Sequence, residues 1–149
     1  MRVLLAIDDS EFSEAATRAL ASKVHAKGTE ILVLQELEPI LHTVIPRMEP
    51  AYTAELAARL EDDRKHANES VFKTADLLRR VGFQVQTRVA ENEVRAAILD
   101  IASDWQADFI VVGSHGIKVL LKFLLGSVAE SVMRHAKCSV WVVRIPPRR

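Results

Sequence analysis

Residues 108–128, DFIVVGSHGIKVLLKFLLGSV, combine an apolar run, three glycines and the start of a helical pattern. The run from Phe109 to Val112 has the continuous hydrophobicity of a strand that is covered on both faces of a sheet. We predict a strand over 108–113, which Gly113 ends. Gly116 follows in the loop, and Gly126-Ser127 opens the helix that we predict next. A buried strand, a glycine-containing loop and a helix in this order are typical of a parallel α/β sheet.

The rest of the chain alternates strand-like and helix-like segments in the same way. Apolar or alternating segments predict four further strands, at 3–7, 31–34, 83–89 and 140–143. Apolar residues that recur on one helical face predict helices over 12–24, 51–81, 94–105 and 128–136. Ser10 or Ser13 can cap the first of these helices, and Gly28 suits its end. Pro39, Pro46 and Pro50 predict a loop over 38–50.

This alternation predicts a fold of the α/β class, with a doubly wound parallel sheet and helices on both faces. In such sheets ligands bind beyond the carboxyl ends of the strands, where the strand order reverses. Asp8 follows the first predicted strand and Gly113 ends the fourth. We therefore expect a binding site that brings these two residues close together.

Composition limits the class of protein and of partner. The 149 residues predict one domain over 1–149, and 20 basic residues balance 20 acidic ones. This balance gives no electrostatic reason to expect a nucleic acid or an anionic membrane as partner. The single cysteine, Cys138, excludes an internal disulfide, and we expect it to be a core residue. Since the sequence shows neither a secretory signal nor a membrane-span pattern, we expect a cytoplasmic protein.

The loop after the fourth predicted strand has the features of an anion site. Glycine is required where φ is positive or where backbone approaches a ligand closely, and Gly113 and Gly116 suit either need. The helix that begins at Gly126-Ser127 offers unpaired N–H groups and the positive end of its dipole. The alternative is that the glycines only make turns. On the residues alone both interpretations remain open.

At this spacing, Gly113-x2-Gly116-x9-Gly126-Ser127, the chain resembles the nucleotide-binding signature of the universal stress protein family. The resemblance covers the whole chain, from the opening Leu4-Leu-Ala-Ile-Asp8-Asp-Ser10 to the closing Cys138-Ser-Val-Trp-Val-Val143. It implies a five-stranded parallel sheet in the order 3-2-1-4-5. It also implies a homodimer formed through the last strand, Val140–Val143, and binding of ATP, with or without Mg²⁺.

The resemblance also implies roles for individual residues. Asp8 would bind the adenine-ribose end of the nucleotide, and Ala6 and Val112 would form walls of the adenine pocket. Ribose and phosphates would be held by Gly113, Gly116, Gly126, Ser127 and Val128. Ser114 and His115 lie inside the same loop and could reach phosphate or a metal ion.

Two segments depart from the family pattern. Gln35-Glu36 stands where the family usually has His-Val, with the valine against adenine. The Glu36 carboxylate could accept a hydrogen bond from the exocyclic amine, or it could point away. The segment Glu91-Asn-Glu-Val94 replaces a Gly-x-Pro turn and makes that rim of the pocket more acidic.

Several other polar residues have two possible roles. Asp8 and Asp9 could form a metal or acid-base pair, but we expect Asp8 to bind ligand and Asp9 to be solvated or to start a helix. Lys118 and Lys122 could neutralise phosphate charge or lie in solvent. The five histidines show no metal-ligand spacing, so we predict no metal site.

The sequence therefore predicts an ATP-binding regulatory or sensor protein of the stress response, acting as a homodimer with unknown protein partners. Because no Gly-Lys-Ser/Thr phosphate loop is present, we expect no fast ATP hydrolysis. One alternative is a slow ATPase or a self-phosphorylating protein that uses Ser127 or Ser114. The other is a structural interaction module that binds no nucleotide.

Overall fold

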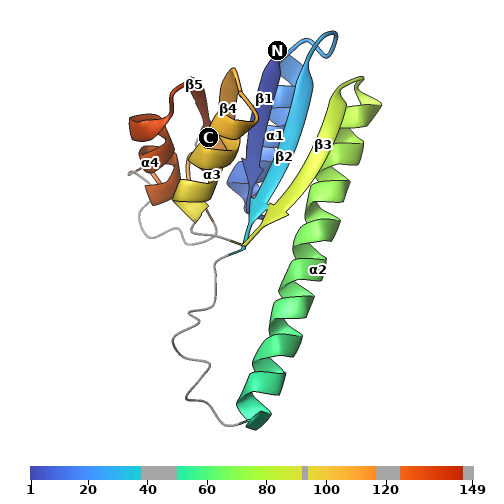
Figure 1. The fold of residues 1–149 in the computed structure, drawn as a ribbon. Coiled ribbons are helices and arrows are strands. Elements are labelled where there is room, and N and C mark those ends of the chain that lie inside the picture. Colours follow the sequence, from blue (N-terminus) through green and yellow to red (C-terminus); the bar gives the residue numbers. More distant parts are fainter. Residues whose placement is uncertain (38–49, 92–93, 117–124, 146–149) are drawn as a thin grey trace.

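The structure is a computed structural model that describes residues 1–37, 50–91, 94–116 and 125–145 (Figure 1). Five strands form one parallel sheet in the order β3-β2-β1-β4-β5, which confirms the predicted fold class and strand order. The strands are β1 (Arg2–Ile7), β2 (Glu30–Glu36), β3 (Gln84–Ala90), β4 (Phe109–Gly113) and β5 (Ser139–Val143).

Helices cover both faces of this sheet, as predicted. They are α1 (Glu11–Lys23), α2 (Pro50–Arg80), α3 (Val94–Asp104) and α4 (Ser127–His135). In the predicted loop at 38–50, Pro50 is the first residue of α2, and the remaining residues lie outside the described part of the chain. Within the described ranges, no helix combines the length and the hydrophobicity that crossing a bilayer requires.

The sheet separates two hydrophobic cores, and the alternation of side chains along β1 shows how. Val3, Leu5 and Ile7 pack toward α1 and α2, whereas Leu4 packs toward α3 and α4. Successive side chains of a strand point to opposite faces, so a strand buried on both faces needs apolar residues at every position. The continuous apolar run in the sequence follows from this requirement.

The start of α1 has one of the two predicted caps. Ser10 is the N-cap residue, and its Oγ accepts a hydrogen bond from the backbone N of Ser13 at 3.2 Å. The helix ends at Lys23, close to the predicted end, but its C-cap is Val24 and not Gly28. Gly28 lies instead in the turn before β2, where its φ of +74° suits glycine.

The long helix α2 extends beyond the sheet. Its 31 residues span about 46 Å at about 1.5 Å per residue, whereas the seven residues of β3 span about 23 Å. Figure 1 shows the N-terminal half of α2 continuing past the carboxyl ends of the strands. Of the predicted apolar face, only the C-terminal part is buried, at Ala67, Val71, Ala75 and Leu78. Leu56 and Leu60 are partly exposed.

Candidate functional site

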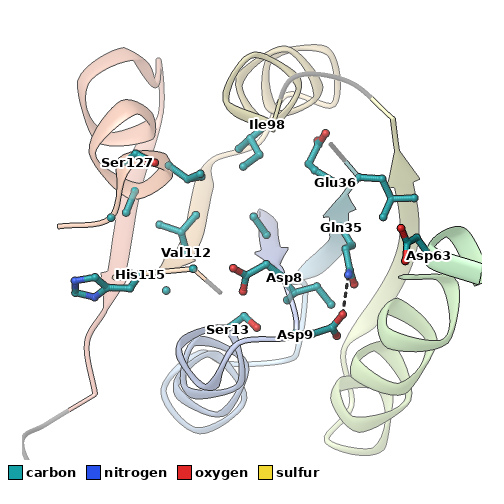
Figure 2. Close-up of a pocket in the computed structure, with 18 of the residues that line it drawn as sticks. Asp8, Asp9, Ser13, Gln35, Glu36, Asp63, Ile98, Val112, His115 and Ser127 are labelled. Atoms are coloured by element: carbon teal, nitrogen blue, oxygen red, sulfur yellow. Dashed lines mark hydrogen bonds between the residues drawn. The ribbon is translucent and has the colours of Figure 1, made fainter. Parts of the chain in front are cut away.

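A pocket of about 470 Å³ lies at the carboxyl ends of β1, β2 and β4 (Figure 2). This is the end of the sheet at which the sequence places the site. Ten of the predicted residues line the pocket: Ala6, Asp8, Glu36, Val112, Gly113, His115, Gly116, Gly126, Ser127 and Val128. The structure thus brings together residues from four separate segments of the chain, and their function stays a prediction.

Ser114 is the predicted residue that does not line the pocket. It is buried, and its backbone N donates to the Val143 carbonyl while its own carbonyl accepts from the Gly126 N, both at 2.8 Å. Its Oγ lies 3.0 Å from Nδ1 of His115. These contacts hold the ends of β4 and β5 and the start of α4 together, so Ser114 has a structural role here.

His115 lines the pocket, but neighbouring side chains fix the orientation of its ring. Its ring packs against Phe12, with 4.9 Å between ring centroids, and in Figure 2 it points away from Asp8. Its Nε2 is buried and has no hydrogen-bond partner in the part of the chain that the structure describes. The ring orientation gives more support to a packing role than to contact with a phosphate.

The glycines of the loop are required by close packing within the protein, not by positive φ as one of our expectations had it. Gly113, Gly116 and Gly126 are not among the residues with positive φ. A Cβ at Gly113 would lie 2.7 Å from Cβ of Phe12, and one at Gly116 would lie 2.6 Å from Oδ2 of Asp8. A Cβ at Gly126 would lie 3.0 Å from Cα of His115. Side chains at these positions would separate the elements that form the pocket.

The N-terminus of α4 faces the pocket. Gly126 is its N-cap and offers no side-chain cap, and Ser127, Val128 and Ala129 line the pocket. The first N–H groups of a helix have no partner within the helix, and the helix dipole adds partial positive charge there. This end of the pocket therefore suits an anion, and the Ser127 hydroxyl can add a further donor.

Asp8 follows β1 at the centre of the pocket. Its Oδ1 accepts hydrogen bonds from Oγ of Ser10 at 2.6 Å and from the backbone N of Ser10 at 3.2 Å. Its Oδ2 lies beside Gly116. The serine fixes the orientation of the carboxylate, which suits it to accept hydrogen bonds from the hydroxyl groups of a ligand.

On the side of the sheet that α3 and α4 cover, the pocket has apolar walls. Ala6 and Val112 come from β1 and β4, Ile98 comes from α3, and Val128 and Ala129 come from α4. Small and branched apolar side chains from both the sheet and the helices leave a slot that suits a flat, largely apolar ring.

Glu36 lines this apolar part of the pocket. The side chain is half-buried, both of its carboxyl oxygens are shielded from solvent, and they have no hydrogen-bond partner among the described residues. In Figure 2 the carboxyl group lies beside Ile98. Burial raises the pKa of Glu36 to about 7, against a smaller lowering by the positive charge of Arg88.

The sequence failed to identify a polar cluster around Asp9. We expected Asp9 to be solvated or to start a helix; it is exposed, and in addition it joins β1 to β2 and to α2. Nε2 of Gln35 donates to its Oδ2 at 2.9 Å, Nε2 of His66 lies 3.3 Å from the same oxygen, and Oγ of Ser70 donates to Oδ1. Asp9 adopts a φ of +62°, in a region that aspartate tolerates better than most residues.

Other pocket residues also escaped the sequence analysis, among them Asp63 and His66 on α2, Ile98 and Ala129. The family resemblance placed Gln35-Glu36 at the site, and a strand prediction that continued through Glu36 would have done so from the residues alone. Asp63 and His66 share one face of a helix, but the sequence gives no sign of where that helix passes the sheet.

Of the two glutamates in the predicted acidic rim, the structure describes Glu91, which is paired with Arg64. Nε of Arg64 donates to Glu91 at 2.5 Å, and this contact holds the pKa of the Glu91 carboxyl below its ordinary value. Asn92, Glu93, Lys118 and Lys122 lie outside the described residues. Within the described ranges, no three His, Cys, Asp or Glu side chains are grouped so that they could hold a metal ion.

Cys138 is partly buried against the core formed with α3 and α4, and burial raises the pKa of its thiol. A raised pKa keeps the thiol protonated and unreactive, which agrees with the expected packing role.

Comparison with known proteins identifies the family. A model of the universal stress protein family matches residues 1–144. A universal stress protein of Thermus aquaticus is 32% identical over 142 residues, which cover 95% of this chain and 97% of that protein. The solved structure of MJ0577, a universal stress protein of Methanocaldococcus jannaschii, has a TM-score of 0.81 at 26% identity and covers 99% of this chain and 97% of that chain.

A more distant structure shows the fold alone. It is the universal stress protein of Archaeoglobus fulgidus in complex with dAMP, with a TM-score of 0.67 at 21% identity, covering 95% of this chain and 96% of that chain. The match over residues 1–144 and the similarity along the whole length of the Thermus aquaticus protein establish that this chain belongs to the universal stress protein family.

Proposed function

We propose that this chain binds an adenine nucleotide, ATP in particular, in the pocket at the carboxyl ends of β1, β2 and β4, and that it acts as a regulatory or sensor protein of the stress response. The observation that carries the proposal is that one pocket of about 470 Å³ joins an apolar slot, a fixed carboxylate and a helix N-terminus. These are the three environments that a base, a ribose and a polyphosphate require. The complex of the Archaeoglobus fulgidus protein with dAMP adds support.

Each part of the nucleotide has a matching group. The base would lie between Ala6, Val112 and Ile98, and the ribose hydroxyls would donate to Asp8. The phosphates would accept from the first N–H groups of α4 and from the Ser127 hydroxyl, with or without Mg²⁺. A regulatory effect requires that ATP binds one conformation of the protein better than another, so that binding shifts the population between them.

Isothermal titration calorimetry with ATP, with and without Mg²⁺, tests the proposal. We expect a saturable binding signal that Gly116→Val abolishes, because a side chain at Gly116 displaces the Asp8 carboxylate. Leu77→Gln is the matched control, since Leu77 is an exposed side chain on α2 and does not line the pocket. The absence of any signal at millimolar ATP would reject nucleotide binding and favour a structural interaction module.

We also propose that the protein forms a homodimer through Val140–Val143. β5 is an edge strand of the sheet, and an edge strand with partly exposed apolar side chains favours pairing with a second chain. Size-exclusion chromatography with light scattering should give twice the chain mass of 16.6 kDa. A mass of one chain at all concentrations would contradict the proposal.

A second candidate function is slow ATP hydrolysis or self-phosphorylation, which the position of the Ser127 hydroxyl in the pocket favours. Incubation with γ-labelled ATP should then release labelled phosphate or label the protein, and Ser127→Ala should reduce the labelling. If the ATP stays intact and the protein unlabelled after long incubation, the protein is a binding protein without this activity.

A further inference from the structure

Glu36 is the one carboxyl group of the described pocket whose oxygens are both buried and unpaired. Asp8 is bonded to Ser10, and Asp9 is bonded to Gln35 and Ser70. A buried polar group without a partner is unfavourable by an amount comparable to a lost hydrogen bond, and such groups are rare in folded proteins. The unpaired oxygens therefore indicate that a ligand supplies the missing partner.

The register of the sheet places this carboxyl group at the base end of the pocket. Ala6 pairs with Leu34 and Ile7 with Gln35, so Glu36 lies beside the position of Asp8. Leu32 and Leu34 pack toward α3 and α4, and because side chains alternate along a strand, Glu36 points to the same side. The apolar slot proposed for the base is on that side.

We propose that Glu36 forms hydrogen bonds with the Watson–Crick edge of the bound base and selects adenine while its carboxyl group carries a proton. This inference rests on the proposed function, since it requires that the pocket binds a nucleotide.

The hydrogen-bonding groups of the two purines differ at this edge. A protonated carboxyl group accepts from the N6 amine of adenine through its carbonyl oxygen and donates its O–H to N1. A carboxylate has only acceptors, so it faces the lone pair of adenine N1 without a donor. The same carboxylate suits guanine, which presents two donors, N1–H and the N2 amine.

Burial makes this change of protonation relevant near neutral pH, because the pKa of Glu36 is about 7. Below this pH the protonated group favours adenine, and above it the carboxylate loses the N1 bond and favours guanine. If only the protonated form binds adenine well, the Kd for ATP rises about tenfold for each pH unit above 7.

Other charged groups lie around the pocket, and both the wild type and the Glu36→Gln variant contain them. They are Arg88 on β3, Asp8 and Asp9 after β1, Asp63 and His66 on α2, and His115 after β4. The residues by which α3 and α4 line the pocket, Ile98 and Ser127–Ala129, carry no titratable side chain. A comparison of the wild type with Glu36→Gln on the same nucleotide therefore isolates Glu36.

The test measures Kd for ATP and for GTP between pH 5.5 and 8.5 with the wild type and with Glu36→Gln. Glutamine presents one donor and one acceptor at every pH, like protonated glutamate. At pH 6 we expect the wild type and the variant to bind ATP with affinities within about twofold of each other. At pH 8 the Kd of the wild type should be about tenfold higher than that of the variant. For GTP the wild type should gain affinity relative to the variant as pH rises.

A second readout uses the wild type alone. The ¹³C chemical shift of the Glu36 carboxyl, assigned through its couplings to the side-chain and backbone atoms of Glu36, should titrate at a higher pH when ATP is bound. Bound GTP should lower the pH at the midpoint of this titration. This measurement decides the matter also if the variant does not fold.

The outcomes separate the two proposals. If wild type and variant bind ATP with the same affinity at every pH, and ATP leaves the Glu36 titration unchanged, the role of Glu36 is rejected while nucleotide binding stands. If neither protein binds any nucleotide at millimolar concentration, the proposed function is rejected together with this inference.

Discussion

At the scale of single residues, the burial of Glu36 links the stability of the fold to pH. The pKa of its carboxyl is raised from an ordinary value of 4.5 to about 7 in the folded protein. Between these values the folded state binds more protons than the unfolded state, so the free energy of unfolding decreases as pH rises. The stabilisation is complete below pH 4.5 and is lost as pH passes through about 7.

Glu36→Gln should remove this dependence. At pH 8 the variant should be more stable than the wild type by about 1–2 kcal/mol, less than the full pKa shift implies because the side chain is only half-buried. At pH 4.5 the two proteins should differ little. Urea unfolding at both pH values measures the difference, and an equal difference at both would contradict the assigned pKa.

The loop glycines give a second prediction at this scale. Gly113→Ala should reduce the free energy of unfolding by about 1–3 kcal/mol, because the added Cβ meets the backbone of Phe12 as well as its Cβ. Gly116→Ala meets only the carboxylate end of Asp8, which can shift away by giving up its hydrogen bonds to Ser10, so it should impair ATP binding more than stability. Chemical denaturation and calorimetry on both variants test this; equal losses of stability would contradict it.

The sequence identified the loop glycines and Glu36 as residues of the site, but it did not show which contacts require them. The spacing of Gly113, Gly116 and Gly126 identifies the loop. Each glycine leaves space for a neighbour, and these neighbours are Phe12, Asp8 and His115. They are distant in the sequence or lie across the loop, so the sequence does not reveal these contacts. The raised pKa of Glu36 also depends on the tertiary structure, because β2 places its side chain next to α3.

At the scale of elements, α2 combines a buried half with an exposed half. Val71 and Leu78 are buried against the sheet, whereas no described side chain from Ala51 to His66 is buried. Most of the stability of a helix in a protein comes from packing of its apolar face. The two halves should therefore differ in stability, although one helical pattern runs through both.

Leu78→Ala and Leu60→Ala form a matched pair that tests this difference. Leu78 is fully buried, so its truncation should reduce the free energy of unfolding by about 2–5 kcal/mol. Leu60 is partly exposed, and its truncation should have an effect below about 1 kcal/mol. Urea denaturation of both variants provides the measurement, and equal effects would show that both halves of α2 pack against the core.

At the scale of the whole molecule, the pocket lies where the strand order reverses. β1 is at the centre of the sheet, β2 and β3 lie on one side of it, and β4 and β5 lie on the other. Helices leave the strands on opposite faces at this point, which opens the crevice that the pocket occupies. Its residues come from β1, β2, β4 and all four helices, so a bound ligand would contact both halves of the sheet.

Binding should therefore stabilise the fold as one unit. ATP at 100 times its Kd should raise the free energy of unfolding by about 2.7 kcal/mol. Thermal unfolding with increasing ATP should show one transition that moves to higher temperature, and no shift with Gly116→Val. A separate transition that is insensitive to ATP would indicate that part of the molecule is not coupled to the pocket.

The sequence by itself determined the fold class and the strand order, the latter through the family resemblance, because apolar periodicity and the loop glycines are local properties of the chain. It also placed the site after the first and fourth strands, since parallel strands end at the same edge. Only the tertiary structure decided that Asp9 joins β1 to α2, and that Glu36 lies in the apolar slot without a hydrogen-bond partner among the described residues. The physical reason is that burial and partners are set by residues that are distant in the sequence.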